Sequence, residues 1–200
     1  ETAGRMGKLG HGDQSERLLA GRVQALSEQE IVVAAAQAGG SHTALLSTKG
    51  QVYAFGAGSS GRLGHGSEED VWEPRIVAAL APYKTVSLGA GAAHTVVLTD
   101  EGHIYTWGCG MLGRLGHGST SDEVLPRRLA LSAAHAGTAP IAVAAGEAHT
   151  CIIRTDGSMI SIGRLTHGRM AQGANAEGAV EALRSAMELQ SGEDWLHFPD

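Results

Sequence analysis

The chain has 200 residues, of which 29 are glycine and two are cysteine, and its formal net charge at pH 7 is −6. A negative chain provides no overall basic field for nucleic-acid phosphates, so we expect no nucleic-acid partner. Two cysteines cannot form a disulfide framework, which favours a reducing intracellular compartment, cytoplasm or nucleus, and the absence of a run of 18 apolar residues predicts no membrane span.

A block of the form G-x-L-G-H-G opens the chain at 7–12 and returns at 61–66 and 113–118, at intervals of 54 and 52 residues. Self-similarity at a period near 50 indicates a repeat architecture. A degenerate copy of the block lies at 168–173. We therefore expect repeats over residues 1–173, with units of about 7–60, 61–112 and 113–167, the degenerate start of a fourth at 168, and a tail at 174–200.

Within each unit the residues predict short strands rather than helices. A His-Thr pair begins an apolar strand, a turn ending in glycine follows, and a second strand closes a hairpin. The predicted hairpin strands are 42–47 with 51–55, 94–98 with 103–107, and 149–154 with 158–162. Further strands are predicted after two prolines, at 75–77 and 127–129, and before the small-residue runs, at 85–88 and 141–144.

Four short strands per 50 residues are typical of one blade of a β-propeller. We therefore predict an all-β fold, in which β-propeller blades of four-stranded antiparallel sheets form a partial, open propeller. The tail differs in composition, because residues 179–190 combine good helix formers with apolar side chains at helical spacing. This helix candidate is interpreted either as packing on the propeller or as a linker.

The block is followed by an A-x-G-x-x-H-T segment, a D-x-G turn and a closing W-G. The order of these motifs resembles the regulator of chromosome condensation repeat. The resemblance covers Gly7 to about Gly173, and Phe55 and Ile162 depart from it where Trp107 matches. In that family the repeats close a seven-bladed propeller. We assign a structural role to the positions that carry the resemblance, namely Gly61, Leu63, Gly64, His65, Gly66, Gly91, His94, Thr95, Gly102, Trp107, Gly108, Gly113, Leu115, Gly116, His117, Gly118, Gly146, His149, Thr150 and Gly157.

Seven blades would need on the order of 360 residues, so we expect a fragment of a longer protein. An open arc would leave two sheet faces uncovered, which predicts self-association of the isolated chain. For the inner glycines of two blocks, Gly64 and Gly116, we expect a positive φ or close packing against a neighbouring strand.

The histidines and glycines do not indicate catalysis. Six histidines occupy repeat-equivalent positions, and side chains in different blades cannot converge on one metal ion, so we expect ring nitrogens bonded to loop backbone. A formal G-x-G-x-x-G at 56–61 follows a hairpin strand and opens no helix, so it fails as a dinucleotide site. Arg62, Arg114 and Arg169 are expected to form a solvated ring. We expect no enzyme activity, no cofactor and no metal.

Two functional classes remain open. The first is a non-catalytic protein-interaction propeller in a larger scaffold, signalling or ubiquitin-ligase-type protein. The second is guanine-nucleotide exchange on a Ran-type small GTPase, as the resemblance implies, although no insertion large enough for a projecting wedge is visible between the signatures. Ultraviolet perception needs tryptophans before the His-Thr pairs, where this chain has Ser41, Ala93 and Ala148.

Overall fold

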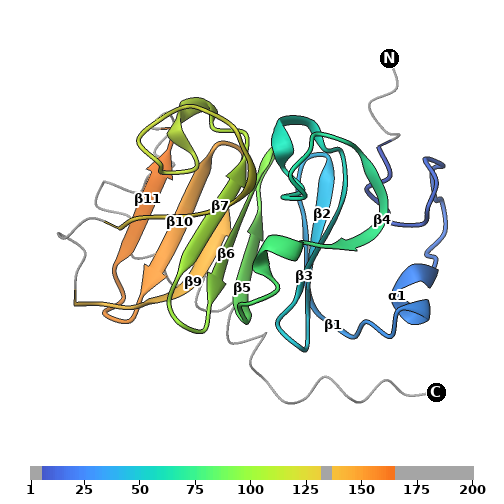
Figure 1. The fold of residues 1–200 in the computed structure, drawn as a ribbon, viewed down its shortest axis with the longest axis horizontal. Helices are drawn as coiled ribbons and strands as arrows, with labels where there is room; N and C mark the ends of the chain where they lie inside the picture. Colours follow the sequence, from blue (N-terminus) through green and yellow to red (C-terminus); the bar gives the residue numbers. More distant parts are fainter. Residues whose placement is uncertain (1–5, 132–136, 165–200) are drawn as a thin grey trace.

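Three antiparallel sheets make up the fold in the computed structural model, which describes residues 6–131 and 137–164 (Figure 1). The sheets contain four, four and three strands, ordered β1-β2-β3-β4, β5-β6-β7-β8 and β11-β10-β9. Their strands are β1 (Val33–Ala38), β2 (His42–Ser47), β3 (Val52–Gly56), β4 (Val71–Ile76), β5 (Thr85–Ala90), β6 (His94–Thr99), β7 (Ile104–Gly108), β8 (Glu123–Arg128), β9 (Pro140–Ala145), β10 (His149–Arg154) and β11 (Met159–Gly163). The predicted all-β fold of antiparallel blades is confirmed.

Helix is scarce in the described ranges. One α-helix, α1 (Gln24–Glu28), precedes the first sheet, and three single 3₁₀ turns occur at η1 (Ser59–Gly61), η2 (Ala78–Leu80) and η3 (Met111–Gly113). The fourth block at 168–173 and the helix candidate at 179–190 lie outside the described residues.

The hairpins follow the predicted pattern closely. The turn glycines Gly50, Gly102 and Gly157 have φ values of +79°, +77° and +80°, a conformation that side chains with a Cβ rarely adopt. The outer strands were predicted too late in the chain, because β4 and β8 begin before Pro74 and Pro126. Each runs at the edge of its sheet, where a residue without an N–H is tolerated, and the register shifts between Ala54 and Gly56 opposite Pro74.

Each sheet packs face to face on the next, with β6 at the centre. Val97 of β6 contributes to a core shared with the first sheet, which includes Leu46 and Val52. Val96 and Leu98 point the other way, into a core with Val143 and Ile152 of the third sheet. Side chains alternate between the two faces of a strand, so β6 is buried on both sides as in a stack of blades.

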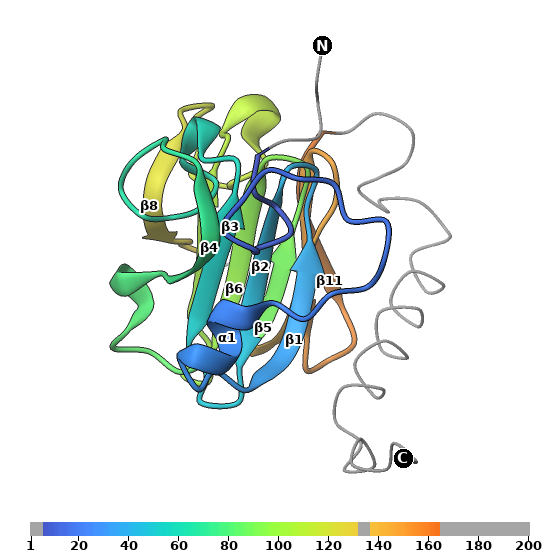
Figure 2. The same ribbon diagram turned by 90° about the vertical axis from the view of Figure 1, so that its right-hand side faces the viewer.

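The end faces of this stack are less open than expected. Leu45, Tyr53 and Phe55, on the far face of the first sheet, are buried with Leu26 and Ile31 packed against them. Figure 2 looks onto this face, with the N-terminal segment and α1 in front of it. Cys151 and Ile153, on the face of β10 opposite to Ile152, are also buried. The expectation of two uncovered faces is therefore wrong for these residues.

The positive φ predicted for the inner block glycines is confirmed, at +74° for Gly64 and +77° for Gly116. A Cβ on Gly64 would lie 2.7 Å from Nε1 of Trp107, and one on Gly116 would lie 2.8 Å from Cδ1 of Leu129. Both strain and contact therefore oppose a side chain. We expect Gly64→Val and Gly116→Val each to lower the free energy of unfolding by roughly 1–3 kcal/mol. Unchanged melting temperatures in both variants would contradict this role.

Candidate interaction surfaces

The threonines of the three His-Thr pairs join each sheet to the block that precedes it. The hydroxyl of Thr43 donates a hydrogen bond to the carbonyl oxygen of Lys8 at 2.8 Å, Thr95 donates to that of Arg62 at 3.0 Å, and Thr150 to that of Arg114 at 2.8 Å. Two backbone bonds donate the other way, from one sheet to the next, from Gly40 N–H to the Gly91 carbonyl and from Ala92 N–H to the Gly146 carbonyl. The repeated threonine is thus a fixed connector between sheets.

The histidines of the first two pairs contact the threonine of the next pair. Nε2 of His42 lies 2.9 Å from Oγ1 of Thr95, and Nε2 of His94 lies 3.0 Å from Oγ1 of Thr150. The single hydroxyl proton of Thr95 is already donated to Arg62, so His42 must donate its Nε2 proton. The same reasoning assigns the proton of His94 to Nε2, and both imidazoles are neutral donors.

Burial keeps these two imidazoles neutral. It lowers the pKa of His42 from 6.5 to about 4, assisted by the charge of Arg62. It lowers the pKa of His94 from 6.5 to about 3, assisted first by the charge of Arg114. Nδ1 of each ring is buried and accepts no hydrogen bond, so a second proton has no acceptor. These rings hold the sheets together and do not act as acid or base near neutral pH.

The inner glycines of the blocks pack on the third strand of the next sheet. A Cβ on Gly10 would meet the Phe55 ring at 2.8 Å, and one on Gly116 would meet Ile162 at 3.0 Å, as Gly64 meets Trp107. Trp107 also donates its indole N–H to the Arg62 carbonyl at 3.0 Å. Phe55 and Ile162 therefore fill the same intersheet position as Trp107, without this hydrogen bond.

The block histidines bond in two ways. His11 and His65 contact the carbonyl oxygens of Leu9 and Ala54, as expected for ring nitrogens bonded to backbone. The Thr106 hydroxyl donates its proton to the Leu115 carbonyl, so His117 donates to that hydroxyl, at 2.9 Å. Like His42 and His94, His117 has a threonine hydroxyl as a partner, which the sequence did not indicate. No group of three possible metal ligands occurs in the described part of the chain.

Arg62 and Arg114 do not belong to a solvated ring. Arg114 is buried and donates to the carbonyl oxygens of Met111 and Glu147. Arg62 is half-buried and bonds the carbonyl and hydroxyl of Ser59. Both side chains brace loops, which corrects the expectation for these two positions. Arg169 lies outside the described residues.

The G-x-G-x-x-G segment at 56–61 lies at the end of β3 and in the 3₁₀ turn η1. A Cβ on Gly58 would lie 1.9 Å from the carbonyl oxygen of Glu69. The absence of a side chain at Gly58 therefore allows the two ends of the β3–β4 loop to approach closely. No helix follows whose N-terminus could receive a phosphate, and the segment is structural.

The tip of the β7–β8 loop is exposed and differs from its counterpart in the first sheet. Leu112 has φ +63° and Ser60 has φ +59°, so the two loops share one turn. Where the first loop has Ser59 and Ser60, the second has Met111 and Leu112, which are 59% and 47% exposed. Leu112 therefore adopts an unfavourable backbone conformation without burying its side chain. These residues are not part of the repeat signature, although the difference between serine and apolar residues at these two positions is visible in the sequence.

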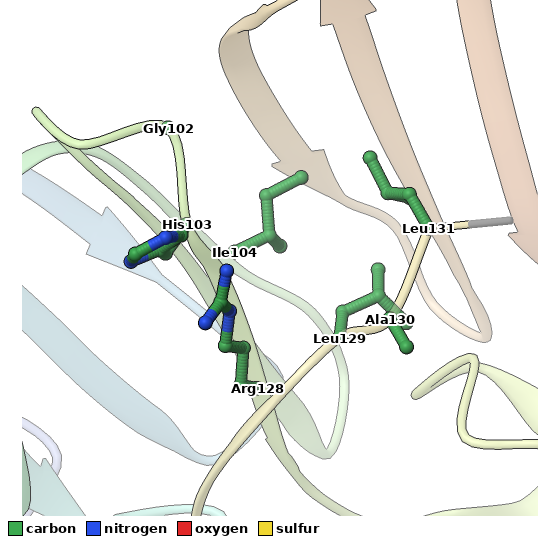
Figure 3. Close-up of a pocket in the computed structure, with 7 residues that line it drawn as sticks. All are labelled: Gly102, His103, Ile104, Arg128, Leu129, Ala130 and Leu131. Carbon is green, nitrogen blue, oxygen red and sulfur yellow. The ribbon is translucent and has the colours of Figure 1, made fainter. Parts of the chain in front are cut away.

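A recess of about 480 Å³ opens where β7 begins and β8 ends (Figure 3). Ile104, Leu129 and Leu131 form its apolar side, and His103 and Arg128 lie on the other side. The His103 ring lies 3.2 Å from a carboxylate oxygen of Glu101. The recess thus combines an apolar wall with the Arg128 guanidinium, and the Glu101 carboxylate lies beside His103.

Comparison with known proteins identifies the repeats. The family model "Regulator of chromosome condensation (RCC1) repeat" matches residues 49–98 and 101–153. A second model with the same description matches residues 33–62 and 86–111. The first model alone covers more than half of the chain. No helix in the described ranges is long and apolar enough to cross a membrane.

Among curated proteins, the chain is similar to human E3 ubiquitin-protein ligase HERC2, with 36% identity over 167 residues, covering 80% of the chain and 3% of the ligase. It is also similar to the Ultraviolet-B receptor UVR8 of Arabidopsis thaliana, with 33% identity over 178 residues, covering 88% of the chain and 39% of the receptor. The chain thus spans only a small part of these relatives.

Solved structures agree on the fold. Human WBSCR16 aligns with a TM-score of 0.67 and 20% identity, covering 84% of this chain and 43% of that one. Yeast RCC1 (Prp20), solved with bound Kap60, aligns with a TM-score of 0.59 and 27% identity, covering 70% of this chain and 32% of that one.

Proposed function

Because the chain belongs to the Regulator of chromosome condensation (RCC1) repeat family, we propose that it is a non-catalytic, protein-binding part of a β-propeller. We place it within a larger intracellular protein of the scaffold, signalling or ubiquitin-ligase type. The partner is a protein, and the proposal assigns no cofactor, nucleic acid or membrane.

One observation carries this proposal. The repeated residues Thr95, His94 and Trp107 are buried in contacts between sheets, whereas Met111 and Leu112 differ between repeats and are exposed. Loops that vary on a rigid scaffold are where binding residues concentrate. Two adjacent exposed apolar side chains on a fixed turn suit a contact with another protein.

The relatives support the same class. HERC2 is named as a ubiquitin-protein ligase, and the present chain matches a small share of it. We infer that this chain supplies recognition, while any ligase chemistry belongs to other parts of such a protein.

The serine pair of the first sheet provides the test. The double variant Met111→Ser with Leu112→Ser copies the residues that already form this turn at Ser59 and Ser60. We expect it to keep or slightly raise the melting temperature and to weaken partner binding at least tenfold. The measurement is quantitative affinity purification of partners, comparing their recovery on the parent and variant chains, followed by titration of the recovered partner.

Val86→Ser is the matched control, because Val86 is 47% exposed but lies in strand β5. Its partner recovery should equal that of the parent chain. Equal partner recovery on the parent chain and on the double-serine chain would show that Met111 and Leu112 do not contribute to binding.

Nucleotide exchange is the alternative, favoured by the 27% identity to yeast RCC1. We expect no acceleration of nucleotide release from a Ran-type GTPase, because the β3–β4 and β7–β8 loops match in length and neither projects a wedge. Fluorescent-nucleotide release, with sedimentation run alongside to test self-association, distinguishes the two functions. Faster nucleotide release in the presence of the monomeric chain would favour nucleotide exchange over protein binding as the function.

A further inference from the structure

Trp72 is an exposed aromatic side chain at the junction between the first block and β4. Its exposed fraction is 42%, and it lines an open hollow of about 490 Å³ together with Gly12, Asp70, Val71 and Glu73. This hollow is separate from the Met111–Leu112 loop tip, which belongs to the next sheet.

The first block packs against one side of Trp72. The backbone of Gly7 approaches so closely that a Cβ there would lie 2.5 Å from Cδ1 of Trp72. The N–H of Gly12 donates a hydrogen bond to the Trp72 carbonyl at 3.0 Å. An aromatic side chain that is already packed on one side loses less conformational freedom when it binds a ligand on the other.

Two acidic residues, Asp70 and Glu73, line the hollow with Trp72, and Glu68 and Glu69 precede them in the same loop. Glu68, Glu69, Asp70 and Glu73 are all exposed, and Glu73 lies against Gly12, where a Cβ would be 2.6 Å from its Oε1. Asp70 accepts a hydrogen bond from Gly58 N–H and thereby braces the loop. None of the three glutamates forms an ion pair within residues 6–131 and 137–164.

The second sheet provides an internal comparison. Its loop keeps the brace, because Asp122 bonds Gly110 N–H as Asp70 bonds Gly58. Val124 then stands in the place of Trp72, packed under Gly61 as Trp72 is under Gly7, and its carbonyl accepts the Gly66 N–H. Thr120, Ser121 and Leu125 replace the three glutamates. The fold therefore needs neither the tryptophan nor the glutamates at these positions.

We propose that the hollow at Trp72 binds a cationic side chain, arginine or lysine, from a basic linear segment of a partner protein. A cation over an indole face is attracted by the ring quadrupole, and the Glu73 carboxylate, which lines the hollow, supplies complementary charge. The exposed Glu68 and Glu69 of the preceding loop add to the negative potential around it. The inference rests on the proposed function in that the occupant is protein, but it assigns a second surface and a partner chemistry.

The test uses the full chain and a fluorescein-labelled twelve-residue peptide of alternating arginine and glycine, followed by fluorescence anisotropy. A peptide with glutamine in place of arginine is the neutral control. We expect Trp72→Val to weaken binding about tenfold, and Trp72→Phe to retain most of it. We expect the triple variant Glu68→Thr, Glu69→Ser, Glu73→Leu to weaken binding at 50 mM salt and to reduce its salt dependence.

Each of these substitutions except Trp72→Phe copies the residue at the corresponding position of the second sheet, so we expect the variants to fold, and thermal melting checks this. Met111→Ser with Leu112→Ser should leave peptide binding unchanged, so this test stands apart from that of the proposed function. The proposal is overturned if Trp72→Val binds within twofold of the parent, if the triple variant is unaffected, or if the glutamine peptide binds equally well.

Discussion

Replacing Thr95 with valine is expected to lower the free energy of unfolding by about 2–3 kcal/mol. Valine keeps the shape of the side chain but removes the hydroxyl that accepts from His42 and donates to the Arg62 carbonyl. The Arg62 carbonyl still accepts a hydrogen bond from the Trp107 indole N–H, whereas the buried Nε2–H of His42 loses its acceptor. A buried donor without an acceptor costs its full desolvation.

Thr43→Val is the matched control for this prediction. Thr43 donates to the Lys8 carbonyl and is half-buried, and its hydroxyl receives no hydrogen bond from a histidine in the described residues. We expect a loss of about 1 kcal/mol or less. Urea unfolding at pH 7.5 gives both values from the transition midpoints and slopes. Equal losses for the two variants would show that the His42 bond contributes nothing.

The second large effect is loss of stability in mild acid. In the folded chain the pKa of His42 is about 4 and that of His94 about 3, against 6.5 when unfolded. Below pH 6.5 these histidines therefore become protonated in the unfolded chain while they stay neutral in the folded chain. The stabilisation is complete above pH 6.5 and is lost as the pH falls toward the folded values.

By pH 5 each of these two histidines should cost about 2 kcal/mol of stability. Burial also lowers the pKa of His65 and His117, which adds in the same direction. Urea midpoints at pH 7.5, 6 and 5 measure the loss. His42→Gln keeps an N–H donor but cannot titrate, so its stability should fall less between pH 7.5 and 5. Equal pH dependence in parent and variant would refute the buried neutral state.

The sequence predicts the hairpins well because their signals are local. An apolar strand, a turn glycine and a second strand lie within about 15 residues, and Gly102 needs its positive φ whatever the neighbouring sheet does. The inner glycines Gly64 and Gly116 were predicted for the same reason. The block repeats at a fixed interval, which identifies the architecture before any contact is known.

Contacts between sheets were not predictable in the same way. His42 bonds Thr95, and Arg114 bonds the Glu147 carbonyl, across 53 and 33 residues. Periodicity shows that these positions recur, but not which side chain reaches which group. The covering of Tyr53 and Phe55 also depends on how residues 6–31 fold back, which no local pattern encodes.

The exposed residues required a different comparison. Trp72 and Met111 are not part of the repeated signature, and a search for shared positions passes over them. Aligning the two complete sheets shows each as a difference on a common backbone, with Val124 and Ser59 as counterparts. Structure was needed to show that these differences are exposed rather than compensated by packing.

The central claim is that the recurrent His-Thr pairs connect neighbouring sheets, and a double-mutant cycle between His42 and Thr95 tests it most directly. The free energies of unfolding of the parent, His42→Ala, Thr95→Val and the double variant give the coupling between the two side chains. We predict a coupling of about 1–2 kcal/mol for this pair, and additivity within about 0.5 kcal/mol for the non-contacting pair His42 and Thr150. Additive losses at His42 and Thr95 would contradict the claim.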